Sequence, residues 1–281
     1  MEVLKTKVAL QEFVSNCRAN NKSIGLVPTM GALHQGHISL VNKALAENDV
    51  VICSIYVNPT QFNNADDLNK YPRTLEHDLA LLKKVNCTAV FNPETSDLYP
   101  NGVNADDFNF GSLVTVMEGK FRPGHFKGMA TVVKRLLLAC TPDRAYFGEK
   151  DFQQLIVIRE LVRQEKLPVQ IIGCPIAREL DGLAMSSRNI RLNVQQRHAA
   201  PVIFESLNEL KKRARIKAID RSKAKSIEII NAHPDLAVEY FEIVDAQTLQ
   251  PIDDWDATAH AMAFTAVLAG DVRLIDNIRL Y

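Results

Sequence analysis

The sequence has no excess of charge of one sign. Its 33 lysines and arginines balance 33 aspartates and glutamates, so the formal net charge at pH 7 is zero. Proteins that bind nucleic acid or an anionic membrane normally carry a basic surface that attracts phosphate. Composition therefore gives no reason to expect nucleic acid or a membrane as a partner, and it counts against a tRNA-binding synthetase. A local basic patch on the surface is compatible with this overall balance of charge.

Targeting signals and paired cysteines are also lacking. No apolar run approaches the roughly 20 residues that a membrane-spanning helix needs, and residues 1–6 lack the features of a secretory signal peptide. The five cysteines are scattered, with no Cys-x-x-Cys pair, and each lies in or beside an apolar stretch. This pattern predicts buried free thiols and a cytoplasmic protein.

The chain has no internal repeat and no low-complexity tract. With 281 residues, 47% hydrophobic and 23% charged, it has the composition of an ordinary globular protein with a substantial core. A large and a small domain are expected at this length.

Short apolar, β-rich runs alternate with helical patterns over the first two thirds of the chain. The predicted strands are Ile24–Val27, Val50–Val57, Ala89–Phe91, Arg144–Phe147 and Val169–Gly173. The predicted helices are Ile38–Glu47, Thr74–Lys84, Met129–Thr141 and Phe152–Glu165. This alternation predicts an α/β fold, a Rossmann-like parallel sheet with helices on both faces. Ligands of such sheets collect at the carboxyl ends of the strands.

The pattern changes after Pro175. Two basic helices are predicted, over Val194–Ala214 and Ser222–Ala232, followed by strands at Val238–Asp245, His260–Ala269 and Val272–Ile278. The last two strands are joined at Gly270-Asp271. We therefore expect a large domain over residues 1–176, with its ligands at the carboxyl ends of the strands, and a smaller α+β domain over residues 177–281. The polar segment 63–70 is predicted to be a mobile loop.

Residues 28–37, Pro-Thr-Met-Gly-Ala-Leu-His-Gln-Gly-His, are the most informative stretch. They connect a buried strand to an amphipathic helix, and a helix N-terminus favours phosphate. If His34 and His37 are helical, they share one face and can hold two points of one polyanion. The alternative is a pair of surface histidines that cap a helix. A Walker A loop is excluded because its Gly-Lys-Ser/Thr ending is absent. The two histidines do not indicate a metal site, because no third ligand follows at a recognisable spacing.

Two further polar segments carry candidate phosphate contacts. In Gly148-Glu149-Lys150-Asp151, Asp151 can serve as a first-turn acid of the next helix, and Lys150 offers a compact cation. Met185-Ser186-Ser187-Arg188-Asn189 supplies two hydroxyls and a forked cation, although alone it would be interpreted as a polar loop. Asp181-Gly182 is expected to form the turn that presents this second loop.

These blocks, together with Asn58-Pro59-Thr60-Gln61-Phe62 and Tyr71-Pro72-Arg73-Thr74, occur in one order along nearly the whole chain. That arrangement resembles the pantoate–β-alanine ligase (pantothenate synthetase) family of the superfamily that carries the His-x-Gly-His motif. The resemblance implies ATP-dependent condensation of D-pantoate with β-alanine through a pantoyl adenylate, with release of AMP and diphosphate. It further implies Mg²⁺, a homodimer, and small molecules as the binding partners.

The resemblance also assigns roles to residues. Catalysis is assigned to His37, His34, Lys150 and Arg188. ATP binding is assigned to Met30, Gly31, Ala32, Leu33, His34, Gln35, Gly36, His37, Gly148, Glu149, Lys150, Asp151, Ala177, Met185, Ser186, Ser187 and Arg188. Pantoate and β-alanine are assigned to Gln61, Gln154, Asn58, Val132 and Val133. Tyr71 is expected to shape the pocket, and the neighbourhood of Asp78 to meet magnesium and phosphate. His77 stands where some relatives carry another acid, so the metal ligands stay unknown.

Several single residues also have a plain structural interpretation. Gln61 and Gln154 could be polar residues near element ends, and Val132 and Val133 fit ordinary core packing equally well. Two other functions compete with the ligase: a nucleotidyltransferase that stops at a nucleotide-linked product, and a nucleotide-binding module without catalysis. Segment 63–73 and the small domain are expected to act as a lid that keeps water from the adenylate.

Overall fold

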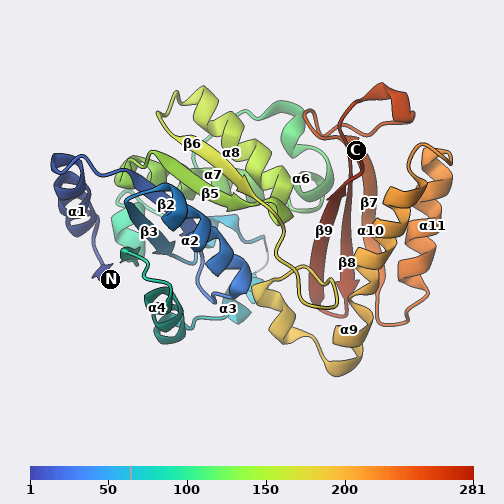
Figure 1. The fold of residues 1–281 in the computed structure, drawn as a ribbon, viewed down its shortest axis with the longest axis horizontal. Helices are drawn as coiled ribbons and strands as arrows, with labels where there is room; N and C mark the ends of the chain where they lie inside the picture. Colours follow the sequence, from blue (N-terminus) through green and yellow to red (C-terminus); the bar gives the residue numbers. More distant parts are fainter. Residues whose placement is uncertain (64) are drawn as a thin grey trace. The chain divides into compact units, whose positions relative to one another are not determined.

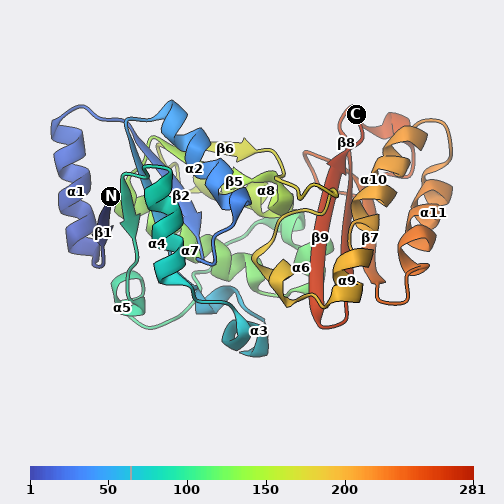
Figure 2. The same cartoon turned by 60° about the horizontal axis from the view of Figure 1, so that its bottom comes forward.

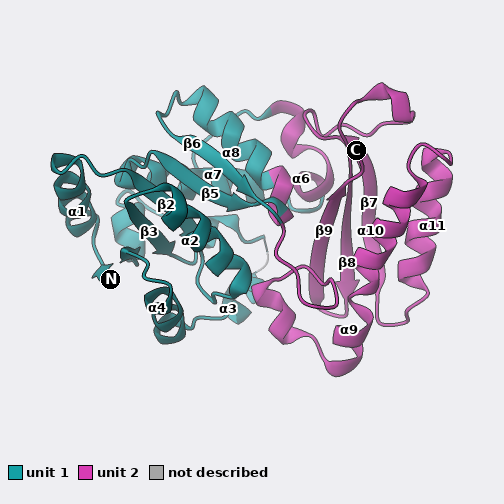
Figure 3. Cartoon of the chain, in the orientation of Figure 1, with its two compact units in different colours: residues 1–110, 121–149, 154–175 teal, residues 111–120, 150–153, 176–281 magenta. Residues whose placement is uncertain are grey.

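The computed structural model describes residues 1–63 and 65–281. They form two compact units, coloured separately in Figure 3. The first contains residues 1–110, 121–149 and 154–175, and the second contains residues 111–120, 150–153 and 176–281. None of the described helices combines the length and apolar character that crossing a membrane requires.

The first unit is built on a six-stranded sheet in the order β1-β4-β3-β2-β5-β6, and every pairing in it is parallel. The strands are β1 (Glu2–Leu4), β2 (Ile24–Thr29), β3 (Val50–Ile55), β4 (Ala89–Phe91), β5 (Arg144–Gly148) and β6 (Gln170–Cys174). All six residues of β3 are buried, as expected for a central parallel strand covered on both faces. The predicted Rossmann-like α/β class is confirmed.

Helices cover both faces of this sheet. The helices that lie wholly or mostly in the first unit are α1 (Lys7–Ala19), α2 (Gln35–Glu47), α3 (Ala65–Lys70), α4 (Leu75–Lys84), α5 (Thr95–Leu98), α7 (His125–Cys140) and α8 (Phe152–Gln164), and of these α3 buries none of its residues. A short 3-10 turn, η1 (Pro59–Gln61), follows β3, and η3 (Glu149–Asp151) follows β5. Side chains of α2 and α4 share a core cluster with β2, β3 and β4. The cartoons place α7 on the face opposite α2 (Figures 1 and 2).

Two parts of the first unit differ from the prediction. The polar segment expected to be a loop contains helix α3, which buries none of its residues and therefore lacks an apolar stripe. Asp66 and Asp67 in its first turn and Lys70 in its last favour the helix dipole. Residue 64 lies outside the described residues. Helix α1 was not predicted, because it buries only Leu10 and Val14.

The second unit contains a three-stranded antiparallel sheet of β7 (Ala237–Asp245), β8 (Ala261–Ala269) and β9 (Val272–Arg279). Helices α10 (Val202–Arg213) and α11 (Ile219–Asn231) pack their apolar side chains against this sheet. The shorter elements are η2 (Gly111–Val114), α6 (Met117–Phe121), η4 (Ser187–Arg191), α9 (Val194–Ala199) and η5 (Trp255–Ala257). The predicted turn between β8 and β9 is confirmed, with Gly270 at φ +58°.

The single helix predicted over residues 194–214 is wrong. The structure has α9 and α10, separated at Ala200 and Pro201. Proline lacks the amide hydrogen that an uninterrupted helix needs, and its fixed φ suits the start of a new helix instead.

Segment 111–120 is fixed to the second unit by buried polar contacts. The Glu118 carboxylate accepts two hydrogen bonds from Arg273, at 2.7 and 2.9 Å, and one from the Tyr240 hydroxyl at 2.8 Å. Burial and the neighbouring Glu118 raise the pKa of Tyr240, which therefore stays a neutral donor. The Gln153 side chain bonds to the backbone of Leu113, Val116 and Glu118. These contacts join α6 to β7, β9 and the start of α8.

All five cysteines are free, and four of them are buried. Burial raises the pKa of Cys140 to about 12 and that of Cys87 and Cys174 to about 11. Since the thiolate is the reactive form, these thiols are inert at neutral pH. The prediction of buried thiols holds for all except Cys17, which is partly exposed.

Candidate active site

The chain turns sharply where β2 ends, at the start of the histidine motif. Thr29 donates to the Ser54 carbonyl at 2.7 Å and accepts from the Gly31 amide at 3.2 Å. Gly31 has φ +79° and Ala32 has φ +49°. A Cβ on Gly31 would lie 3.0 Å from an Asp78 oxygen and 3.1 Å from Ile55. This position requires glycine, both for its backbone conformation and for the close approach of its neighbours.

The fully buried carboxylate of Asp78 in α4 holds this turn. Its Oδ2 accepts from the Ala32 amide at 2.9 Å, and its Oδ1 accepts from the Leu33 amide at 2.8 Å and from the Thr74 hydroxyl at 3.1 Å. Both oxygens are thus occupied by groups of the protein. The carboxylate thus shapes the backbone of the motif. Contact between the neighbourhood of Asp78 and magnesium or phosphate stays a prediction.

His34 and His37 form a capping box at the N-terminus of α2. His34 is the N-cap residue, and its Nδ1 accepts from the Gly36 amide at 3.1 Å. His37, three positions later, accepts the His34 amide on its own Nδ1 at 3.3 Å. The two ring centroids are 4.1 Å apart. The capping role is therefore confirmed, and contact of the paired rings with phosphate stays a prediction.

This capping box determines how the two imidazoles are protonated. A ring nitrogen that accepts an amide hydrogen carries no proton, so each neutral ring carries its proton on Nε2. Each ring thereby becomes an Nε2–H donor at the positive end of a 13-residue helix. Such donors suit a polyanion or an oxyanion that gains charge during a reaction.

A second group of predicted residues lies where η1 packs against α7. Asn58 is 1% exposed, donates to the Gly128 carbonyl at 3.1 Å and accepts from the Tyr99 hydroxyl at 2.6 Å. A Cβ on Gly128 would lie only 2.0 Å from the Thr60 carbonyl oxygen. Asn58 and Gly128 therefore hold η1 directly on α7. A contact between Asn58 and a substrate stays a prediction.

Gln61 lies at the end of η1 and connects this group to the histidine motif. The side-chain amide of Gln61 contacts the sulfur of Met30, and the backbone carbonyl oxygen of Gln61 lies 2.7 Å from Nδ1 of buried His125. Val132 and Val133 are 6% and 5% exposed, on the same helix as His125. Gln61 is thus placed beside the predicted ATP loop. For the two valines, core packing is evident, and contact with a substrate stays a prediction.

The second predicted phosphate loop belongs to the second unit. Residues 177–185 form a hairpin, in which Arg178 bridges to Ala184 and the Met185 amide donates to the Ala177 carbonyl at 3.0 Å. Gly182, at φ +92°, forms the predicted turn. Ser186 then caps η4, since its hydroxyl accepts from the Arg188 amide at 3.2 Å. The hairpin presents Ser187 and Arg188 on a single 3-10 turn.

The segment after β5 is divided between the two units. Gly148, Glu149 and Gln154 belong to the first, and Lys150 and Asp151 to the second. The Lys150 ammonium lies 3.6 Å from an Asp151 oxygen, and its side chain is 19% exposed.

Tyr71 is buried and contacts Phe62 edge to face. Arg73 donates to the Tyr71 carbonyl at 3.4 Å, so both residues belong to one local structure.

Sequence analysis missed three residues that organise these segments, Arg178, Asp276 and Asn277, together with the structural role of Asp78. Asp78 had a visible signal, because it lies four residues before Leu82 on the buried stripe of α4. A buried acid needs hydrogen-bond partners. The other three gave no local signal, since the bonds that tie Arg178 to Asp276 and Asn277 to Lys150 join residues 98 and 127 positions apart.

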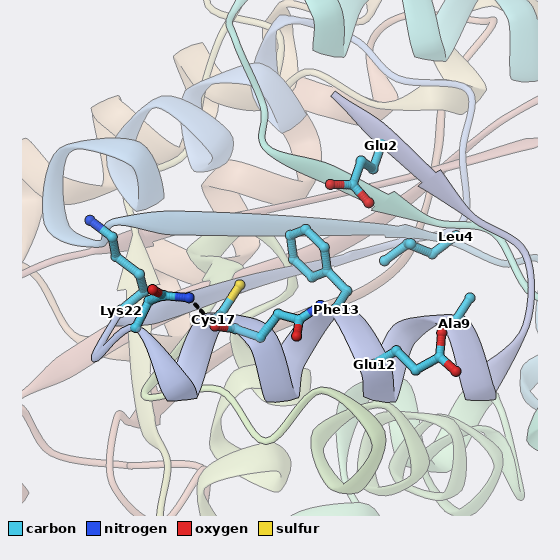
Figure 4. A pocket seen from close by; sticks show the side chains of 9 residues that line it. Glu2, Leu4, Ala9, Glu12, Phe13, Cys17 and Lys22 are labelled. Atoms are coloured by element: carbon cyan, nitrogen blue, oxygen red, sulfur yellow. Dashed lines mark hydrogen bonds between the residues drawn. The ribbon is translucent and has the colours of Figure 1, made fainter.

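A shallow groove on the first unit is unrelated to these segments. It has a volume of about 450 Å³ and lies between α1 and β1 (Figure 4). Its lining is Glu2, Leu4, Ala9, Glu12, Phe13, Asn16, Cys17, Asn20 and Lys22. No residue of the predicted site lines it.

Among residues 1–63 and 65–281, no group of three or more histidine, cysteine or acidic side chains is placed to hold a metal ion.

Curated relatives match the chain over nearly its whole length. The pantothenate synthetase of Porphyromonas gingivalis is 51% identical over 282 residues, which covers 99% of each chain. The pantothenate synthetase of Azobacteroides pseudotrichonymphae is 53% identical over 279 residues, with the same coverage.

Solved structures share the fold. The pantothenate synthetase of Thermus thermophilus matches with a TM-score of 0.94 at 40% identity, over 100% of both chains. The pantoate–β-alanine ligase of Francisella tularensis, complexed with β,γ-ATP and β-alanine, matches with a TM-score of 0.84 at 37% identity, over 100% of this chain and 98% of that one.

The family model described as Pantoate-beta-alanine ligase matches residues 2–279. That span contains the histidine motif, η1, Lys150 and the loop at Ser186. The chain therefore belongs to the pantoate–β-alanine ligase family.

Proposed function

We propose that this protein condenses D-pantoate with β-alanine at the expense of ATP, giving pantothenate, AMP and diphosphate. The observation that carries the proposal is the histidine capping box, which sets two Nε2–H donors at the N-terminus of α2. The Francisella tularensis relative, complexed with β,γ-ATP and β-alanine, supports ATP and β-alanine as substrates. Family membership supports pantoate as the acid.

In the first step, a carboxylate oxygen of pantoate attacks the α-phosphorus of ATP. The bond from the α-phosphorus to the bridging oxygen breaks, and diphosphate leaves. His34 and His37 would stabilise the charge on the phosphate oxygens by donating from Nε2, and Lys150 and Arg188 would add positive charge. Ser186 and Ser187 would contribute hydroxyl donors. No side-chain nucleophile is required, so catalysis depends on positioning and electrostatics.

In the second step, the amine of β-alanine attacks the acyl carbon of the pantoyl adenylate. The carbon–oxygen bond to AMP breaks, AMP leaves, and the amine loses a proton to solvent. Gln61 and Gln154 would hold pantoate through their amide groups, which both donate and accept. Gln61, beside Met30, would also lie near β-alanine.

Magnesium, oligomeric state and location are part of the proposal. Asp78 uses both carboxylate oxygens within the protein, which favours a Mg²⁺ ion held by ATP phosphates and water. Family resemblance supports a homodimer and a cytoplasmic location. Light scattering would test the homodimer, because it gives the molecular mass of the protein in solution. Residues 1–176 and 177–281 are proposed as functional domains, with the second domain and segment 63–73 acting as a lid.

AMP formation by the purified protein tests the function directly. ATP and Mg²⁺ are supplied with or without D-pantoate and β-alanine. We expect AMP only when the acid and the amine are both present. A stable nucleotidyl conjugate without any need for an amine would assign the chain another nucleotidyl transfer. ATP binding without turnover would leave it a binding module.

Replacing Gln154 with alanine is expected to raise the KM for pantoate about 10- to 100-fold. A hydrogen bond to a charged group contributes roughly 1.5–3 kcal/mol, which corresponds to that range. Initial rates at varied pantoate, with ATP and β-alanine saturating, measure the change. Gln164→Ala on the same helix is the control, since that side chain contacts the Asn109 carbonyl and Glu160. An unchanged KM in the Gln154 variant would argue against the contact.

A further inference from the structure

Two of the proposed phosphate-binding groups in the second unit are anchored at one place. Lys150 lies before α8, and the loop at Ser186 follows the hairpin of residues 177–185. Both segments bond to two consecutive residues of β9, Asp276 and Asn277. Neither residue belongs to the sequence motifs that indicate phosphate binding.

Asn277 holds the backbone of Lys150. Its side-chain Nδ2 donates to the Lys150 carbonyl at 2.9 Å, and the residue is only 3% exposed. A lysine side chain is a flexible four-carbon stem, so the position of the backbone sets the region that the ammonium can reach. The Asn277 bond fixes that backbone on β9, the last strand of the chain.

Asp276 holds the hairpin through Arg178. The guanidinium donates to the two carboxylate oxygens at 2.7 and 2.9 Å, and its Nη1 also donates to the Gly182 carbonyl at 3.0 Å. The same guanidinium stacks on the ring of Phe204, 3.7 Å from its centroid. Arg178 is thus held by two planar contacts and reaches the turn of the hairpin that precedes Ser186.

This ion pair is an inefficient means of stabilising a fold. Asp276 is 4% exposed, and burial raises the pKa of its carboxyl against the opposing effect of Arg178. The free energy needed to remove two charges from water is about as large as the attraction between them. A protein with a packed apolar pair in place of the ions is often equally stable. What a bidentate pair supplies beyond stability is a fixed geometry.

We propose that Asp276 and Asn277 are positioning residues that hold Lys150 and the Ser186–Arg188 loop in one rigid frame. The inference rests on the proposed function. Asn277 sets the backbone of Lys150, and Asp276 sets the hairpin through Arg178. Because the two residues are adjacent on β9, a shift of this strand moves both groups together and preserves their spacing.

The frame should matter most for the step that involves phosphates. Adenylate formation needs charges aligned with the α-phosphate and the leaving diphosphate, whereas the attack of the amine on the acyl carbon does not need that alignment. A misplacement of about 1 Å can slow a reaction roughly 100-fold. Loosening the frame should therefore slow the first step selectively.

Asn277→Ala tests the proposal. Pantoate-dependent exchange of labelled diphosphate into ATP measures the first step, and supplied pantoyl adenylate with β-alanine measures the second. We expect exchange to fall about 10- to 100-fold, mainly in kcat, with the second step reduced less than threefold. Equal losses in both steps, or unchanged exchange, would overturn the proposal.

Thr265→Val is the matched control. Thr265 is fully buried on β8, pairs with Asp276 across the sheet, and donates its hydroxyl to the Tyr240 carbonyl at 2.9 Å. The variant loses one buried hydrogen bond in the same sheet without touching Lys150 or the hairpin. We expect it to lower the melting temperature while exchange per folded molecule stays normal. A matching loss of exchange would mean that the effect in the Asn277 variant is general softening of the sheet.

Arg178→Lys keeps the proposal testable if the alanine variant does not fold. Lysine retains the charge but not the fork that spans both Asp276 oxygens. Exchange should fall again, with the second step largely preserved, and an unaffected exchange rate would contradict the frame. Wild-type protein is measured first in every series. If it shows no pantoate-dependent exchange, the proposed function has failed rather than the frame.

Discussion

Replacing His37 with alanine is expected to slow adenylate formation by roughly 100- to 1,000-fold, the usual effect of removing one donor to a charge-bearing oxygen. The Nδ1 of His37 accepts the His34 amide, so the proposed contact with phosphate uses Nε2–H. The variant also loses half of a capping box, which costs about 0.5–2 kcal/mol of stability. Pantoate-dependent diphosphate exchange and thermal unfolding measure the two effects separately.

His37→Gln separates the cap from the chemistry. Glutamine at the third helical position reaches back to the N-cap amide in ordinary capping boxes. Glutamine uses the end of its side chain for this bond, whereas His37 uses Nδ1 and presents the other ring nitrogen, Nε2–H, to a ligand. We expect the glutamine variant to regain the melting temperature of the wild type and to remain slow. An alanine variant with wild-type exchange would remove His37 from the mechanism.

Replacing Asp78 with alanine is expected to destabilise the protein by about 3–5 kcal/mol. Each hydrogen bond to a charged acceptor contributes roughly 1.5–3 kcal/mol, and the amides of Ala32 and Leu33 would both lose theirs. The turn that precedes the histidines would relax, because Gly31 and Ala32 adopt positive φ against this carboxylate. ATP affinity should therefore fall with stability. Urea unfolding and ATP titration measure both quantities.

Glu76→Ala is the control for this experiment. Glu76 lies in the first turn of the same helix but is exposed, and surface substitutions usually change stability by less than about 0.5 kcal/mol. If the Asp78 variant unfolded at the same urea concentration as the control and bound ATP normally, the carboxylate would not organise the motif.

The parallel sheet was predictable because its central strands are apolar at nearly every position, a pattern confined to strands covered on both faces. The histidine turn was predictable because its glycines and its flanking strand and helix lie within a few residues. Helix α3 was missed because it buries nothing. The break between α9 and α10 was predictable from the sequence, because Pro201 lies between them.

The contacts that organise the site were less accessible to sequence analysis. Asp78 bonds to an amide 46 positions away, and Asn277 to a carbonyl 127 positions away. Periodicity and turn chemistry describe neighbours along the chain and carry no information on such pairs. The same limit applies to the histidine rings, since the choice between Nδ1 and Nε2 depends on the cap geometry and not on residue type.

The division of the chain between its units affects how the protein folds during synthesis. The sheet of the first unit is complete once β6 leaves the ribosome. Helix α6 must wait, because its Glu118 is bonded to Arg273, 155 residues later. Contacts so distant in sequence form slowly. The frame of Lys150 and the Ser186 loop therefore forms only when the last strand emerges, so a nascent chain cut short before β9 would lack the anchors of these groups.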